Sequence, residues 1–142
     1  MTTKPLLAAE KLNNDPRLAK AKQLILDAVA EHQETLVSVR PPRPELVVDY
    51  EQLLDQFGAI RGGKTFFPYL GSGIGNGPFV ELADGSVKLD LIIGIGVHGY
   101  GHSHPRLINA GIDAAIGDTV MQGNLQQNAS SCDIVKLLTD VA

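Results

Sequence analysis

An eight-residue stretch, Gly58-Ala-Ile-Arg-Gly-Gly-Lys-Thr65, matches the phosphate-loop pattern G-x-x-x-x-G-K-[ST] letter for letter. In a true phosphate loop, backbone amides surround the phosphates, the lysine neutralises them and the hydroxyl binds magnesium. That chemistry needs a buried strand before the loop and a helix after it. Residues 51–57 instead have the pattern of a polar-faced helix, and Pro68 and Gly71 interrupt any helix that follows. A connector is the preferred interpretation, and nucleotide binding through Lys64 is the weaker alternative.

Three histidines, His98, His102 and His104, lie close enough in the sequence to suggest a metal site. No cysteine or carboxylate stands beside them, so capping or packing roles are preferred. The glycines of residues 71–77 do not follow the G-x-G-x-x-G spacing of a dinucleotide-binding loop, and a turn is expected there. The one cysteine, Cys132, is expected to be a small buried apolar side chain rather than a nucleophile.

Two helices are predicted ahead of these residues. Asp15 can cap a helix whose first turn contains Pro16. The apolar stripe of that helix consists of Leu18, Ala21, Leu24, Ile25, Ala28, Val29 and His32. The proline-rich stretch 39–44 ends it. A second, short helix is predicted over residues 49–57, with Asp49 as its cap.

Strand-like residues begin after Pro78. Residues 79–82 and 87–91 are two short runs joined by Ala83-Asp-Gly-Ser86, and Asp-Gly is a strong hairpin signal because both residues tolerate positive φ. A glycine-rich loop is predicted over residues 92–104, then a helix opened by Pro105. A last apolar helix is predicted from about Asn128, and it has no stop signal before residue 142, so we expect a cut chain rather than a finished domain.

The bulk properties exclude several classes of protein. The net charge of -4 over 142 residues gives no electrostatic reason to expect binding to nucleic acid or to an anionic membrane. A single cysteine excludes an internal disulfide, which favours a reducing compartment. The early apolar run 5–9 is too short for a signal-peptide core or a membrane span. A cytoplasmic protein is expected.

Five short motifs follow one another between Gly71 and Pro105: Gly-x-Gly, Ala-Asp-Gly, Leu-Asp, Gly-Ile-Gly-Val and Gly-His-x-His-Pro. Their order and spacing resemble the N-terminal signature of the class III pyridoxal-phosphate aminotransferases, the ornithine-, acetylornithine- and 4-aminobutyrate-type family. The resemblance extends over residues 67–141. It departs from the family where residues 80–82 replace an aromatic-rich stretch and where Gly111 replaces a helix-forming residue.

The resemblance implies an α+β fold that is the N-terminal part of a fold-type I pyridoxal-phosphate enzyme, with the large domain missing. Residues 1–65 would be a helical N-terminal extension and connector, and residues 66–142 a short antiparallel hairpin with flanking helices. The full-length protein would be a homodimer that moves an amino group from an amine or amino acid to a 2-oxo acid, with pyridoxal phosphate as cofactor. The Schiff-base lysine would lie outside this chain, so the chain alone would be inactive.

The resemblance also assigns site residues. Ile95 would line the substrate pocket, although a role as core filler is equally open. Gln122 and Asn124 would approach the substrate, and Met121 and Gly123 the cofactor phosphate, near the dimer interface. The competing interpretation is a stand-alone binding or dimerisation domain without catalysis. A stop codon directly after residue 142 would favour that domain, and a continuing reading frame would favour the enzyme.

Overall fold

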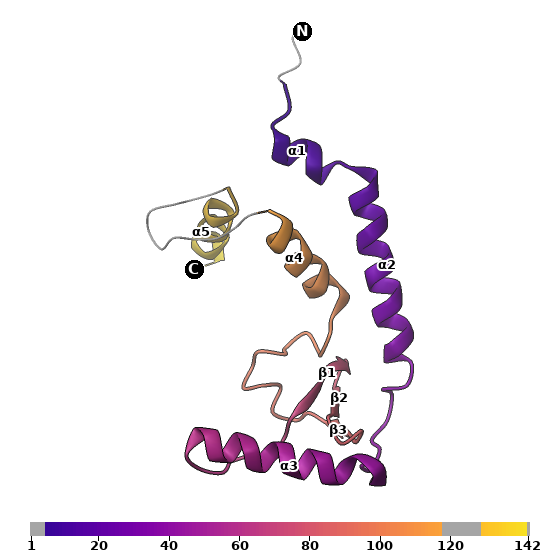
Figure 1. Cartoon of the computed structure of the whole chain (residues 1–142). Helices are drawn as coiled ribbons and strands as arrows, with labels where there is room; N and C mark the ends of the chain where they lie inside the picture. The colour runs from indigo at the N-terminus through magenta and orange to yellow at the C-terminus, as the bar shows by residue number, and fades with distance from the viewer. Residues whose placement is uncertain (1–4, 118–128, 142) are drawn as a thin grey trace.

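The computed structural model describes residues 5–117 and 129–141. Its helices are α1 (Ala8–Asn13), α2 (Pro16–Gln33), α3 (Pro44–Arg61), α4 (Pro105–Ile116) and α5 (Ala129–Val141), and its strands are β1 (Gly71–Asn76), β2 (Phe79–Leu82) and β3 (Val87–Leu89). The α+β class is confirmed. Figure 1 shows α2 along one side of an open arrangement, with α3 beneath the sheet and α5 on the opposite side from α2. Over the two described ranges, no helix has both the length and the apolar character needed to cross a membrane.

Helix α2 begins where the sequence predicts. The Asp15 carboxylate accepts a hydrogen bond from the Arg17 amide at 2.8 Å, and Pro16 occupies the first helical turn. The side that is half-buried differs from the predicted stripe, because Leu24 and Ile25 are exposed. The half-buried residues are Leu18, Lys22, Leu26, Val29 and Gln33. Contact with α4 and β1 decides which side of α2 is covered, and that side is not the predicted apolar stripe.

Helix α3 is much longer than the predicted segment 49–57. It starts at Pro44, because proline fits the first turn, where its missing amide hydrogen is not needed. It continues through Gly58 and ends at Gly62, whose φ of 83° is the left-handed conformation common after helices. The expected cap, Asp49, therefore lies inside the helix. The short helix α1 was also not predicted.

The sheet has three antiparallel strands in the order β1-β2-β3, one more than the predicted hairpin. Strands β2 and β3 pair with Phe79 opposite Leu89, as the Asp-Gly turn indicates. The glycine-rich segment 71–77 was expected to be a turn, and this was wrong, because residues 71–76 form strand β1 with an irregular register between Gly71 and Gly75. Glycine is a poor strand former, so only the pairing with β2 reveals this strand.

The small core lies at the hairpin turn. Val87 and Ser86 are fully buried, Asp84 is nearly so, and the Asp84 carboxylate accepts from the Ser86 amide at 2.8 Å. Arg40 and Val87 exchange two backbone hydrogen bonds of 3.0 Å, so the chain ahead of α3 lies along the outer edge of β3. Leu36, in the connector between α2 and α3, is also buried, at 1% exposed.

Helix α4 is held between α2 and the loop that precedes it. His104 caps α4 by accepting from the Arg106 amide, at 3.2 Å from its Nδ1, beside Pro105 in the first turn. The Lys22 ammonium lies 2.7 Å from the Asp113 carboxylate and joins α2 to α4. The side chain of Gln33 ties the end of α2 to the Gly75 carbonyl oxygen at 2.7 Å.

Candidate functional site

The loop over residues 91–101 closes on itself at one corner of the sheet. The Asp90 amide donates to the Pro78 carbonyl oxygen, and the His102 amide donates to the Gly77 carbonyl oxygen, both at 2.8 Å. Because Gly77 and Pro78 are neighbours in the turn between β1 and β2, the two ends of the loop leave the sheet side by side. Compact loops closed in this way are Ω-loops, which frequently carry function.

The side chains of Asp90 and His102 join across the neck of this loop. The Nε2 atom of His102 lies 2.8 Å from the Oδ2 atom of Asp90, and since an ionised carboxylate can only accept, the ring nitrogen donates. The other carboxylate oxygen accepts from the amides of Ile92 and Ile93 at 2.9 Å each. The hydrogen bond from His102 is the largest cause that lowers the pKa of the Asp90 carboxyl, and the backbone hydrogen bonds lower it further. Both side chains are largely buried.

The tip of the loop is a left-handed turn. Four consecutive residues, Ile93, Gly94, Ile95 and Gly96, have φ values of 48°, 55°, 59° and 86°. The Ile95 amide donates to the Ile92 carbonyl oxygen and the His98 amide to the Ile93 carbonyl oxygen, both at 2.9 Å, and these bonds close the turn. Left-handed backbone suits glycine but is a real outlier for a β-branched residue such as isoleucine. The Ile95 side chain is 91% exposed, so it is not core filler.

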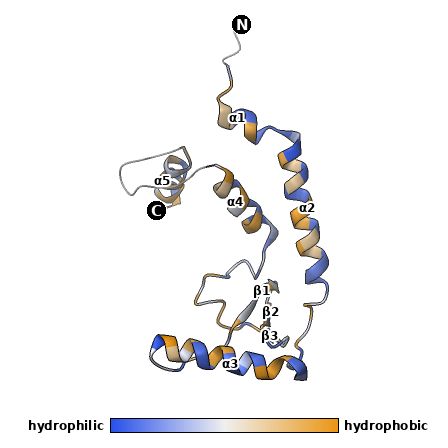
Figure 2. Ribbon diagram, viewed as in Figure 1, coloured by the Kyte–Doolittle hydropathy of each residue, from blue (hydrophilic) through white to orange (hydrophobic). Residues whose placement is uncertain are grey.

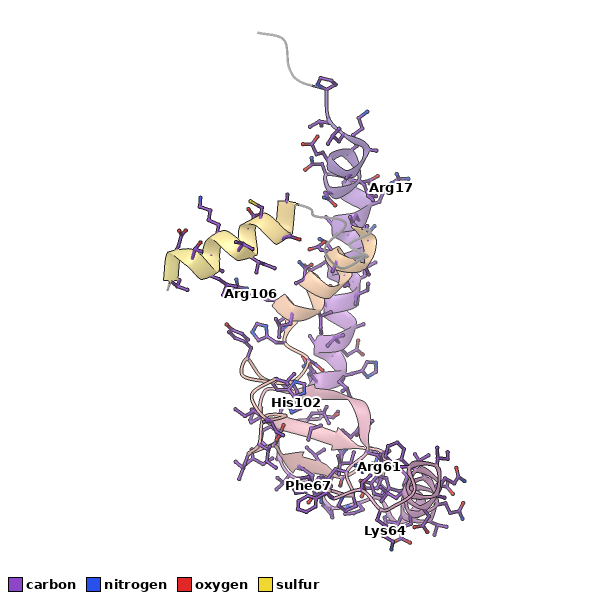
Figure 3. The ribbon with its side chains drawn as sticks, turned by 90° about the vertical axis from the view of Figure 1, so that its left-hand side faces the viewer. Arg17, Arg61, Lys64, Phe67, His102 and Arg106 are labelled. Atoms are coloured by element: carbon purple, nitrogen blue, oxygen red, sulfur yellow. The ribbon has the colours of Figure 1, made fainter. Side chains whose placement is uncertain are left out.

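The ring of His102 is fixed on three sides. Its Nε2 bonds to Asp90, and its face stacks on His98 with the ring centroids 4.1 Å apart. A Cβ atom at Gly75 would come within 2.5 Å of the His102 Cβ, so β1 must carry a glycine where this histidine packs. A Cβ at Gly94 would likewise meet the His98 ring at 2.8 Å. Figure 3 shows His102 between the start of α4 and the sheet.

A hollow of about 930 Å³ lies between the sheet and this loop. Its apolar lining consists of Val39, Pro41, Phe67, Tyr69, Val80, Leu82, Val87, Leu89, Leu91, Ile92 and Ile95. Its polar lining is Arg40, Lys88, Asp90, His98 and His102. The Arg40 guanidinium is occupied by the Glu81 carboxylate at 2.9 Å. Pockets of this size and apolar character accept small molecules, and an open face like this one can also accept side chains of another polypeptide.

The structure places only part of the predicted site. Ile95 lies at the rim of the hollow. Met121, Gln122, Gly123 and Asn124 lie outside the described residues. Among the residues described, no group of three or more potential metal ligands comes together.

Two smaller expectations need correction. Cys132 is exposed rather than buried. The histidines were expected to cap or to pack, but His102 bonds the Asp90 carboxylate, and His104 acts as a helix cap. Sequence reasoning missed the Asp90–His102 pair because the two residues stand at opposite ends of a loop. The Leu-Asp and Gly-His motifs stand on either side of a glycine-rich segment, and this arrangement could have indicated that Asp90 and His102 meet.

The arrangement can hold the loop over residues 91–101 in one conformation and orient one acid–base pair, Asp90 and His102. A carboxylate that holds the Nε2 proton leaves Nδ1 of the neutral ring as an acceptor.

The phosphate-loop pattern offers no comparable site, because Gly58 to Arg61 are the last residues of α3 and no helix begins between residues 62 and 70. Compared with known proteins, the chain matches no family model, no curated protein and no solved structure.

Proposed function

We propose that this chain is the N-terminal portion of a class III pyridoxal-phosphate aminotransferase, which moves an amino group from an amine or amino acid to a 2-oxo acid. In this proposal Ile95 contacts the amino donor or acceptor. The Schiff-base lysine is supplied by residues outside this chain, so the chain alone is catalytically incomplete.

The proposal is supported by the local geometry of the motif residues. The Asp84-Gly85 turn joins two strands, and Gly85 has a φ of 75°. Asp90 and His102, from the Leu-Asp and Gly-His motifs, bond to each other at the neck of one loop. The Gly-Ile-Gly motif between them forms the left-handed turn that exposes Ile95. The observation that carries the proposal is this convergence of three separate motifs on one loop that projects an apolar side chain.

The described residues do not fit pyridoxal phosphate by themselves. The cations that line the hollow are Arg40 and Lys88, together with any protonated histidine. Arg40 is bound to Glu81, and Lys88 is an exposed residue on β3. We therefore assign no step of the reaction to this hollow, and the cofactor would be held by parts of the enzyme outside these residues.

The direct test is to follow the reading frame beyond codon 142 and to express the complete protein. The proposal expects a protein that binds pyridoxal phosphate and transfers an amino group from at least one donor in a panel of amines and amino acids. Borohydride reduction of the isolated chain mixed with cofactor should leave no covalent adduct at a single lysine. A stop codon directly after residue 142, or stoichiometric labelling of one lysine in the isolated chain, would contradict the proposal.

A matched pair of substitutions tests the role of Ile95 in the complete enzyme. Ile95→Ala should change the KM for the amino donor or acceptor, since it removes apolar contact with the substrate. Val97→Ala is the control, because Val97 lies on the same loop, is 73% exposed and does not line the hollow. Equal effects of the two substitutions would remove Ile95 from the proposed site.

A non-catalytic binding or dimerisation domain is the second candidate. The observation in its favour is the apolar side of α5, where Ile134, Val135, Leu137, Leu138 and Val141 are each at least 59% exposed.

Nucleotide binding through Lys64 loses support, because the phosphate-loop pattern lacks the strand that should precede it and the helix that should follow it. Calorimetry with ATP should show no micromolar binding by the wild-type chain, and Lys64→Ala should change nothing.

A further inference from the structure

The left-handed turn over residues 93–96 costs conformational free energy. Ile93 and Ile95 are β-branched residues in a backbone conformation that costs free energy for every residue except glycine. Burial offsets little of this cost at Ile95, because 91% of the residue remains exposed. A conformation of this kind persists only where the surrounding structure holds it.

The restraint comes from the neck of the loop. One oxygen of the Asp90 carboxylate accepts from the amides of Ile92 and Ile93, the residues that lead into the turn. The other oxygen is held by His102, whose own amide is anchored on the Gly77 carbonyl oxygen. The sheet therefore fixes His102, His102 fixes the Asp90 carboxylate, and the carboxylate sets the backbone at the start of the turn.

We propose that Asp90 and His102 are positioning residues that hold the turn over residues 93–96 in its left-handed form, so that Ile95 stands at the rim of the hollow. The pair acts on the turn and not on the sheet as a whole. The buried residues Ser86 and Val87 lie at the opposite end of β3 from Asp90. The positioning does not depend on the proposed function, and only the identity of what Ile95 contacts rests on it.

Amide hydrogen exchange of the full chain tests this proposal without cofactor or substrate. In His102→Ala and Asp90→Ala, the amides of Ile95 and His98 should exchange about ten- to a hundredfold faster, the effect of losing a hydrogen bond to a charged group. The amides of β2 and β3 should keep their wild-type exchange. Equal acceleration in the turn and in the strands would show a general structural role and overturn the proposal.

Asp90→Asn supplies the conservative variant, in case Asp90→Ala fails to fold. The side-chain carbonyl of asparagine can still accept from the amides of Ile92 and Ile93, so exchange in the turn should be intermediate between wild type and Asp90→Ala. Asp113→Asn is the matched control, because it removes the carboxylate bound to Lys22 and should leave the turn unchanged. Wild-type exchange of Ile95 and His98 in both Asp90→Asn and His102→Ala would also overturn the proposal. A failure of the complete protein to transfer amino groups would instead reject the function and leave this result standing.

Discussion

At the scale of single residues, Ile95 combines two costs. It has a φ of 59°, and its apolar side chain is 91% exposed. An isolated exposed isoleucine is ordinary, but an exposed isoleucine in left-handed backbone stabilises nothing that the described residues show. Residues held against a local penalty cluster at functional sites, and we therefore propose that Ile95 contacts a ligand or a partner.

Ile95→Gly should therefore stabilise the chain. The substitution removes the left-handed penalty of about 1–2 kcal/mol, which exceeds the entropic cost of glycine in the unfolded chain of roughly 0.5–1 kcal/mol. The expected net gain is a few tenths to about 1 kcal/mol in urea denaturation followed by circular dichroism. Ile95→Ala is the control, since it removes the side chain but keeps the Cβ, and it should change stability much less. A loss of stability in Ile95→Gly would show that the isoleucine side chain is stabilising.

Asp90 gives the chain a pH dependence whose sign follows from its hydrogen bonds. The folded-state pKa of this carboxyl is lowered, chiefly by the hydrogen bond from His102, whereas the unfolded value is about 3.9. The folded state therefore favours the ionised carboxylate, and this stabilisation is complete above about pH 5. It is lost as the pH falls from about 5 through the folded-state pKa. The Coulombic contribution to this lowering also comes from His102.

Denaturation with urea at several pH values between 6 and 3 measures this effect. Wild type should be more stable than Asp90→Asn at pH 6, and the difference should shrink towards zero at low pH, where the wild-type carboxyl is protonated. A difference that is independent of pH would mean that the charge on Asp90 contributes nothing.

At the scale of elements, α3 is fastened to the following connector by one hydroxyl. The Tyr50 hydroxyl donates to the Pro68 carbonyl oxygen at 2.7 Å and accepts from the Leu70 amide at 3.0 Å. Tyr50 is 9% exposed, so these two bonds lie at the edge of the core. They fix the segment that leads from α3 into β1, and with it the Phe67 side of the hollow.

Tyr50→Phe should destabilise the chain by about 1–3 kcal/mol, because it leaves two partly buried backbone groups without a partner. The segment 62–70 should also become easier to cleave, which limited proteolysis followed by mass spectrometry can locate. Tyr69→Phe is the control, because Tyr69 is 60% exposed and stacks on Phe67 through its ring. If both variants behave alike, the Tyr50 hydroxyl does not anchor this segment.

At the scale of the whole molecule, the chain covers few of its apolar side chains. Figure 2 shows hydrophobic residues along every helix of the open arrangement. Helix α2 covers one side of α4, where Ile108, Ile112 and Ile116 are half-buried. The apolar side of α5 and the loop over residues 91–101, with Leu91 and Val97, stay exposed.

We expect the chain to self-associate for this reason. Several hundred Å² of apolar surface would favour association by several kcal/mol before entropic losses, at about 25 cal/mol per Å². A symmetric dimer is the expected form, because an isologous contact closes on itself. Light scattering over a dilution series to low micromolar concentration measures the mass. Leu138→Glu should weaken the association, and Leu24→Glu on α2 is the control; a monomer mass at every concentration would contradict the prediction.

Local chemistry in the sequence determined several elements of this protein. Asp15-Pro16 placed the start of α2, Asp84-Gly85 placed the hairpin, and His104-Pro105 placed the start of α4. Each of these signals acts within a few residues, because caps and turns satisfy backbone groups of their immediate neighbours. The same reasoning predicted the loop over residues 92–104.

Only the tertiary structure decided the remaining features. Strand β1 exists because a glycine-rich segment pairs with β2, and α3 starts at Pro44 because a proline that ends one segment can also begin a helix. The covered side of α2 depends on where α4 lies. The pair Asp90 and His102 meets only because Gly77 and Pro78 bring both ends of the loop to one turn. Contacts between distant residues carry no local pattern, so neither propensity nor periodicity could reveal them.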